Sequence, residues 1–137
     1  MAVIKELIQV ESNGTISFGD YTLDAKAKLD NFEVGGALYK VKTYKDITKL
    51  ECNDVFVYES VPGTAVLGFD KKETEVTFEV EGTEGAQITL GLDAETEYEI
   101  VINGESVGTM VTNLGGKISF SVELEEGATA SVSVSKK

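Results

Sequence analysis

Apolar residues alternate with polar ones at a period of two along most of this chain. Val76, Phe78 and Val80, for example, are separated by Thr77 and Glu79. Successive side chains of a β-strand point to opposite faces, so each run offers one face to a core and the other to water. Such runs recur about every 8–12 residues, which is typical of a sandwich or barrel. We therefore expect an all-β protein with an antiparallel β-sandwich.

Turn residues fall between these runs. Asn103-Gly104, Gly35-Gly36 and Asn53-Asp54 each separate two apolar runs by two residues. Asn-Gly and Gly-Gly supply the positive φ angles of a type I′ turn, so these pairs predict tight β-hairpins. Further turns are expected at Asn13-Gly14 and at residues 114–116, which precede the apolar runs TISF and KISFSVEL.

Two stretches leave alternatives open. Residues 1–10 have apolar spacing that suits a helix, but their β-branched content and the following Asn-Gly favour a strand. Residues 24–30 fit either one helical turn or an irregular edge. Pro62 lacks an N–H for a ladder, so we expect no central strand to run through it.

Residues 92–98 read Leu-Asp-Ala-Glu-Thr-Glu-Tyr. This segment resembles the L-x-P-x-T-x-Y signature of fibronectin type III-like sandwiches, with Ala94 at the usual proline. The resemblance implies a tyrosine corner, in which Tyr98 is buried and its hydroxyl bonds to backbone a few residues upstream. It also implies that Leu92 caps the core. Phe120, in the run KISFSVEL, is expected in the core as well.

The resemblance covers roughly residues 75–134 and suggests two parts. We predict a β-hairpin-rich N-terminal subdomain over residues 1–70 and a fibronectin type III-like β-sandwich over residues 71–137. Each half is small for an independent fold, so a shared core is expected.

The charged residues are strongly unbalanced. The chain has 24 acidic residues against 12 basic ones, a net charge of −12, and every basic residue is lysine. A surface this negative repels phosphate backbones and anionic lipids, so neither nucleic acid nor a membrane is expected as a partner. No signal-peptide pattern and no long apolar segment is present, so we expect a cytoplasmic protein.

The whole chain is similar to short clostridial proteins that carry an endosialidase-type label. The label implies cleavage of sialic-acid polymers, whose carboxylates such enzymes hold with arginine. This chain has no arginine, and it also lacks histidine and tryptophan. The composition therefore argues against that activity.

Little catalytic chemistry remains. Cys52 has no imidazole to activate it, and without histidine the usual transition-metal ligand sets are missing, so we expect no metal site, no cofactor and no enzyme activity. The acidic segment at residues 79–85 leaves a calcium ion open as an alternative to a polar hairpin loop. A carboxylate pair for glycoside hydrolysis is a distant third alternative. Glu95, Glu97 and Glu99 share one strand face, which we interpret as solvated.

A binding site is the second alternative. Tyr39, Val41 and Thr43 share one face of their run, and Lys40, Lys42 and Tyr44 share the other. Tyr44 and Tyr58, with Lys40 and Lys42, could bind a carbohydrate or an acidic peptide. Our first expectation is a non-catalytic structural or assembly protein that forms a homo-oligomer; a glycan or protein is the alternative partner.

Overall fold

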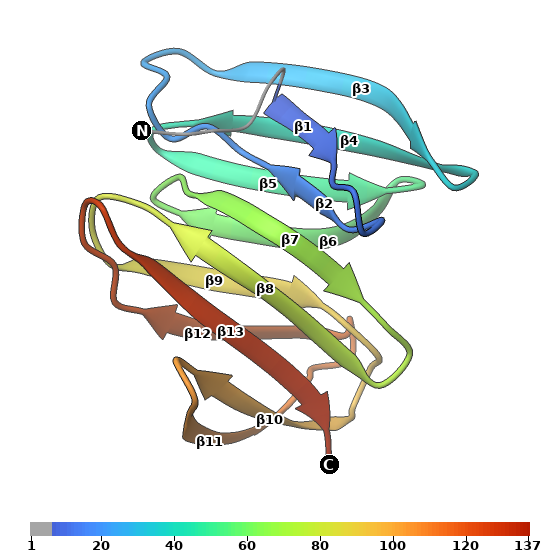
Figure 1. Ribbon diagram of the computed structural model, residues 1–137. Helices are drawn as coiled ribbons and strands as arrows, with labels where there is room; N and C mark the ends of the chain where they lie inside the picture. Colours follow the sequence, from blue (N-terminus) through green and yellow to red (C-terminus); the bar gives the residue numbers. More distant parts are fainter. Residues whose placement is uncertain (1–6) are drawn as a thin grey trace.

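The computed structural model describes residues 7–137, which form two antiparallel β-sheets packed face to face (Figure 1). The seven-stranded sheet has the order β1-β2-β7-β8-β13-β10-β11, and the six-stranded sheet has the order β12-β9-β6-β5-β4-β3. The β-sandwich predicted from the period-two pattern is confirmed. β3 and β11 lie at opposite ends of the sandwich in Figure 1.

The strands of the seven-stranded sheet are β1 (Ile8–Val10), β2 (Ile16–Phe18), β7 (Ala65–Lys71), β8 (Glu75–Glu81), β10 (Glu97–Ile102), β11 (Glu105–Val111) and β13 (Thr129–Lys136). Those of the six-stranded sheet are β3 (Ala27–Val34), β4 (Ala37–Tyr44), β5 (Ile47–Cys52), β6 (Val55–Val61), β9 (Ala86–Gly91) and β12 (Lys117–Val122).

Each of the three predicted two-residue turns has both residues at positive φ. The angles are 52° and 83° at Asn103-Gly104, 57° and 86° at Gly35-Gly36, and 51° and 65° at Asn53-Asp54. These are the angles that a type I′ hairpin requires. The turns at Asn13-Gly14 and before β12 are also present.

The two open stretches are now assigned. Ile8–Val10 form a strand, as favoured, while residues 1–6 lie outside the described part of the chain. The 24–30 stretch is an irregular edge, because β3 begins at Ala27 and its pairing with β4 shifts between Leu29 and Phe32. β6 ends at Val61, immediately before Pro62.

One aromatic cluster joins the two sheets. Tyr58 of β6 meets Phe18 of β2 at a centroid distance of 5.3 Å and Phe78 of β8 at 5.7 Å, both edge to face. Phe69 of β7 packs against Phe18 and Phe78. This cluster draws on both sides of residue 70, and the β7–β8 hairpin crosses that point. The halves predicted as 1–70 and 71–137 therefore share a core and both sheets.

A buried chain of hydroxyl groups lies beside this cluster. Thr48 Oγ1 accepts the backbone N–H of Thr64 at 3.0 Å and lies 2.8 Å from Thr43 Oγ1. Thr64 Oγ1 in turn lies 2.9 Å from the Tyr58 hydroxyl and 2.8 Å from Ser60 Oγ. Because buried polar groups are costly unless paired, this network fixes the connection between β6 and β7.

The residues predicted to be structural lie in or against the core. Tyr98 and Phe120 are buried, and Leu92 is half-buried and packs against the core. The Tyr98 hydroxyl accepts a hydrogen bond from the backbone N–H of Asp93, five residues upstream, at 3.2 Å. This is the contact that the tyrosine corner implies.

Candidate functional site

The predicted binding residues of β4 share one outward face. Lys40 is exposed, and Lys42 and Tyr44 are half-buried, while Val41 and Thr43 point into the core. The structure thus brings Lys40, Lys42 and Tyr44 together on the outer surface of the six-stranded sheet.

Tyr58 does not belong to this surface, and its prediction as a binding residue is wrong. Its side chain is fully buried between the sheets, and burial raises its pKa to about 12. The physical reason is a bulge: Leu50 pairs with Tyr58 but Glu51 pairs with Phe56, which leaves Val57 as an extra residue. The extra residue interrupts the alternation, so Val57 and Tyr58 are both buried.

The ring of Tyr44 is not an open platform for a sugar. The Nζ of Lys26 lies 5.9 Å from its centroid, in cation–π contact with the ring face. The pKa of Tyr44 is raised, first by desolvation and then by Asp46, so the phenol is neutral at pH 7.

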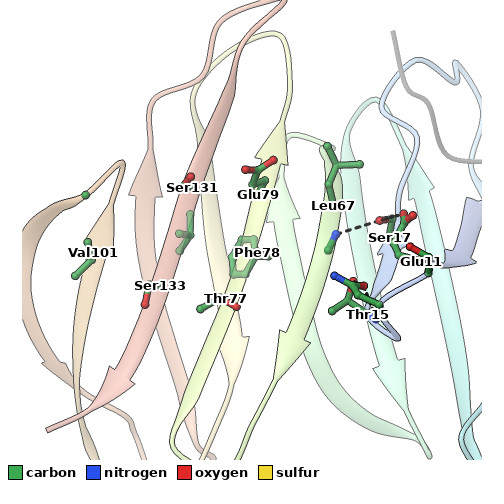
Figure 2. Close-up of a pocket in the computed structure, with 15 residues that line it drawn as sticks. Glu11, Thr15, Ser17, Leu67, Thr77, Phe78, Glu79, Val101, Ser131 and Ser133 are labelled. Carbon is green, nitrogen blue, oxygen red and sulfur yellow. Dashed lines mark hydrogen bonds between the residues drawn. The ribbon is translucent and has the colours of Figure 1, made fainter.

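The outer face of the seven-stranded sheet carries a groove of about 730 Å³. Figure 2 shows Thr77 and Glu79 of β8 beside Ser131 and Ser133 of β13, with Ser17 and Glu11 across the groove. Polar residues occupy most of the outward positions of these strands, so short hydroxyl side chains, Asn13 and two carboxylates make up much of the lining. Its apolar members are Leu67, Phe78, Val101 and Val132.

Hydrogen bonds in this groove stabilise the charged form of Glu11. Ser17 Oγ donates to the carboxylate of Glu11 and accepts the N–H of Gly68 at 3.0 Å. The hydrogen bond from Ser17, followed by that from Gln9, lowers the pKa of Glu11. A glycosidase needs one carboxyl group with a raised pKa, and Glu11 is shifted in the opposite direction.

A second cleft, of about 550 Å³, opens between the sheets near the start of β4, the end of β5 and the start of β6. Tyr39, Cys52 and Phe56 line it, and Lys117 Nζ lies 4.6 Å from the Phe56 centroid. Burial and the neighbouring Cys52 raise the pKa of Tyr39. This cleft was not visible in the sequence, because its walls come from eight separate strands and the turns beside them.

The carboxylates offered as a distant alternative are solvated. Glu97 is exposed and Glu99 is half-buried on the outer side of β10. Glu95 is exposed in the turn before this strand, with a φ of 49°, so the three do not share one strand face as predicted. Within residues 7–137, no group of three or more histidine, cysteine, aspartate or glutamate side chains is placed to hold a metal ion.

β11 is a further candidate surface that the sequence did not single out. It forms one edge of the seven-stranded sheet, and all seven of its residues are exposed. Val107 is 58 % exposed and Val111 is 63 % exposed, and Leu114, in the following turn, is 81 % exposed. An exposed edge strand offers unpaired backbone groups to another chain.

No protein-family model, no curated protein and no solved structure matches this chain. Across the residues that the structure describes, no helix is long and apolar enough to cross a membrane.

Proposed function

We propose that the protein is a non-catalytic assembly protein that forms a homodimer by pairing β11 with β11 of a second copy. The observation that carries this proposal is the exposed edge from Ser106 to Val111, which has apolar side chains and no charge. In a chain with 26 % charged residues, positions 106–116 contain none. Apolar side chains along an exposed strand are typical of an interaction surface.

The other three edges carry features that discourage pairing. β1 has three residues. β3 carries Lys28, Asp30 and Glu33 and is interrupted by its irregularity. The apolar side chains of β12 are buried in the core. Short strands, charges and bulges are the usual means of blocking an edge. β11 has a bulge of its own, because Ile100 pairs with Gly108 and Val101 pairs with Ser106, but it is seven residues long and carries no charge after Glu105, so it is the edge best suited to a partner.

A twofold axis would place the two copies of β11 antiparallel and continue the sheet across the dimer. Val107, Met110 and Val111 would lose contact with water, which favours association. Each copy has a net charge of −12, so their repulsion opposes it. Added salt screens this repulsion and should therefore strengthen the dimer.

The lowered pKa of Glu11 and the buried position of Tyr58 support assembly over catalysis or sugar binding. Wild type should show twice the chain mass of 14.7 kDa by size-exclusion chromatography with light scattering at micromolar concentration. Val107→Lys with Val111→Lys should weaken the dimer at least about tenfold, because lysines would be buried at the interface.

Val55→Lys is the matched control. Val55 is 65 % exposed but lies at the β5–β6 turn, away from β11. This variant should keep the wild-type mass and the same response to salt. A monomeric wild type at micromolar concentration, or a β11 variant that dimerises as well as the control, would overturn the proposal.

A further inference from the structure

The outer face of the six-stranded sheet holds a row of lysines on adjacent strands. In the sheet register, Lys28 of β3 lies opposite Lys42 of β4, and Lys42 lies opposite Lys49 of β5. Directly opposite side chains are about 4.5–5.5 Å apart at Cβ, and like charges in that position destabilise a sheet. With Lys40 they form what we call the lysine face, in a protein of net charge −12.

Carboxylates of the protein neutralise this face only in part. Glu51 lies 3.8 Å from Lys40 Nζ and 3.7 Å from Lys49 Nζ, and Glu59 is opposite Lys49. No ion pair joins Lys28 or Lys42 to a carboxylate of residues 7–137. The four lysines and Glu51 line a hollow of about 230 Å³. The unfavourable charges therefore surround a concave surface.

An apolar border lies beside the lysine face. Tyr44 pairs with Ile47, and Val61 on the neighbouring β6 is 53 % exposed. Lys26 Nζ lies over the Tyr44 ring, so the exposed contact that this border offers is mainly aliphatic. A polypeptide can supply both carboxylates and aliphatic side chains to such a surface, whereas a sugar chain stacks on aromatic rings.

We propose that the lysine face binds a short, carboxylate-rich segment of a partner polypeptide. Lys28 and Lys49 are two strands apart, about 9–10 Å at the backbone. In an extended segment, side chains two residues apart lie about 6.8 Å from each other. The lysine backbones are farther apart than the alternate side chains of the segment, but long lysine side chains can reach across that difference. A segment with acidic residues at alternate positions therefore matches the spacing of the lysine face. The acidic remainder of the surface repels long polyanions such as nucleic acid.

This assignment predicts opposite effects on stability and on binding. Lys42 has a lysine on each side, so Lys42→Gln removes two like-charge contacts and should leave the melting temperature unchanged or raise it. The same change removes the central cation of the face and should weaken binding. A residue with a purely structural role would lower stability when replaced.

The test uses fluorescence anisotropy with a labelled peptide of alternating Glu and Val, and a Gln-Val peptide as the uncharged probe. Wild type should bind the Glu peptide, and raising NaCl from about 0.05 M to about 0.5 M should weaken binding. Lys42→Gln with Lys49→Gln should reduce affinity at least about tenfold without loss of melting temperature. Lys72→Gln with Lys137→Gln, at exposed lysines outside the face, should bind like wild type.

Three results would overturn the proposal: no binding of the Glu peptide, equal binding of the Gln peptide, or equal losses in the two double variants. A uronic acid oligosaccharide of matched charge serves as a second probe. Binding of the oligosaccharide without binding of the peptide would reject a polypeptide partner. None of these outcomes depends on β11, so the dimer is tested separately.

Discussion

The backbone N–H of Asp93 donates a hydrogen bond to the hydroxyl of Tyr98, with 3.2 Å between the two atoms. The side chain of Asp93 also pairs with Lys136 Nζ at 2.6 Å, and Lys136 lies opposite Tyr98 in the β10–β13 pairing. The hydrogen bond with Lys136 is the main cause of the lowered pKa of Asp93. The loop before β10 is therefore attached to two neighbouring strands.

Tyr98→Phe should destabilise the protein by about 1–3 kcal/mol, because the Asp93 amide loses its partner while the ring still fills its place. Urea unfolding measures this change. Tyr44→Phe, on the half-buried outer face of β4, should stay within about 0.5 kcal/mol of wild type. Equal stabilities of the two variants would count against the tyrosine corner.

Thr112 is the second attachment of the same loop. Its hydroxyl donates to the carbonyl of Asp93 and accepts the N–H of Thr96 at 2.9 Å, and the residue is 3 % exposed. Thr112→Val keeps the shape of the side chain but leaves the Asp93 carbonyl and the Thr96 N–H without the hydroxyl partner. We expect this to lower the free energy of unfolding by about 1–3 kcal/mol.

Thr112→Ser keeps the hydroxyl and should cost less, about 1 kcal/mol for one lost methyl group. Both variants can be compared by denaturant midpoints. If serine were as damaging as valine, the methyl group rather than the hydroxyl would be the important part of Thr112.

Tyr58 should make the protein sensitive to alkaline pH. Its ordinary pKa of 10.0 applies in the unfolded chain, while burial raises the folded value to about 12. Above pH 10 the unfolded state loses the phenolic proton first, so stability is fully present below pH 10 and falls as pH rises toward 12. This shift of two pKa units corresponds to about 2–3 kcal/mol of the free energy of unfolding.

This contribution can be isolated with Tyr58→Phe, followed by urea unfolding between pH 8 and about 11.5. The variant is less stable at pH 8 because the Thr64 hydroxyl loses a contact. Its stability should nevertheless decline less steeply with pH than that of wild type. Parallel declines would show that Tyr58 has no part in the alkaline transition.

Gly63 allows a close approach of two backbone segments. A Cβ at this position would lie 2.0 Å from the carbonyl oxygen of Tyr44. Gly63→Ala therefore requires the β6–β7 connection to move, and we expect a loss of more than about 2 kcal/mol. Gly85→Ala is the control, because its Cβ would meet only ordinary contacts, the nearest at 3.5 Å. Similar melting temperatures for the two variants would contradict the close approach.

The sequence was a good guide wherever local chemistry decides the structure. Hairpin turns such as Asn103-Gly104 were predictable, because few residues adopt two successive positive φ angles. The hydrogen bond from the Asp93 amide to the Tyr98 hydroxyl is of the kind that the motif at residues 92–98 implied. The order of the strands in the sheets could not be predicted from the sequence. β10 lies between β11 and β13, both later in the chain, and no local pattern in the sequence indicates that arrangement.

The candidate sites depended on features that period-two alternation cannot show. The bulge at Val57 moved Tyr58 into the core. The irregularity between Leu29 and Phe32 shifts the register of β3 by one residue, which sets Lys28 opposite Lys42. Alternation predicts which face of the sheet a residue occupies. Which residues lie opposite one another on neighbouring strands depends on the register, and a single extra residue changes that register.

The position of β13 has a consequence for biosynthesis. β13 is the last strand in chain order, yet it lies between β8 and β10 in the middle of its sheet. While a ribosome makes the protein, β8 and β10 emerge first and have no partner on that side until β13 follows. Folding of this sheet is therefore largely completed after translation of its final strand. Until then its exposed strand edges are open to aggregation and to chaperones.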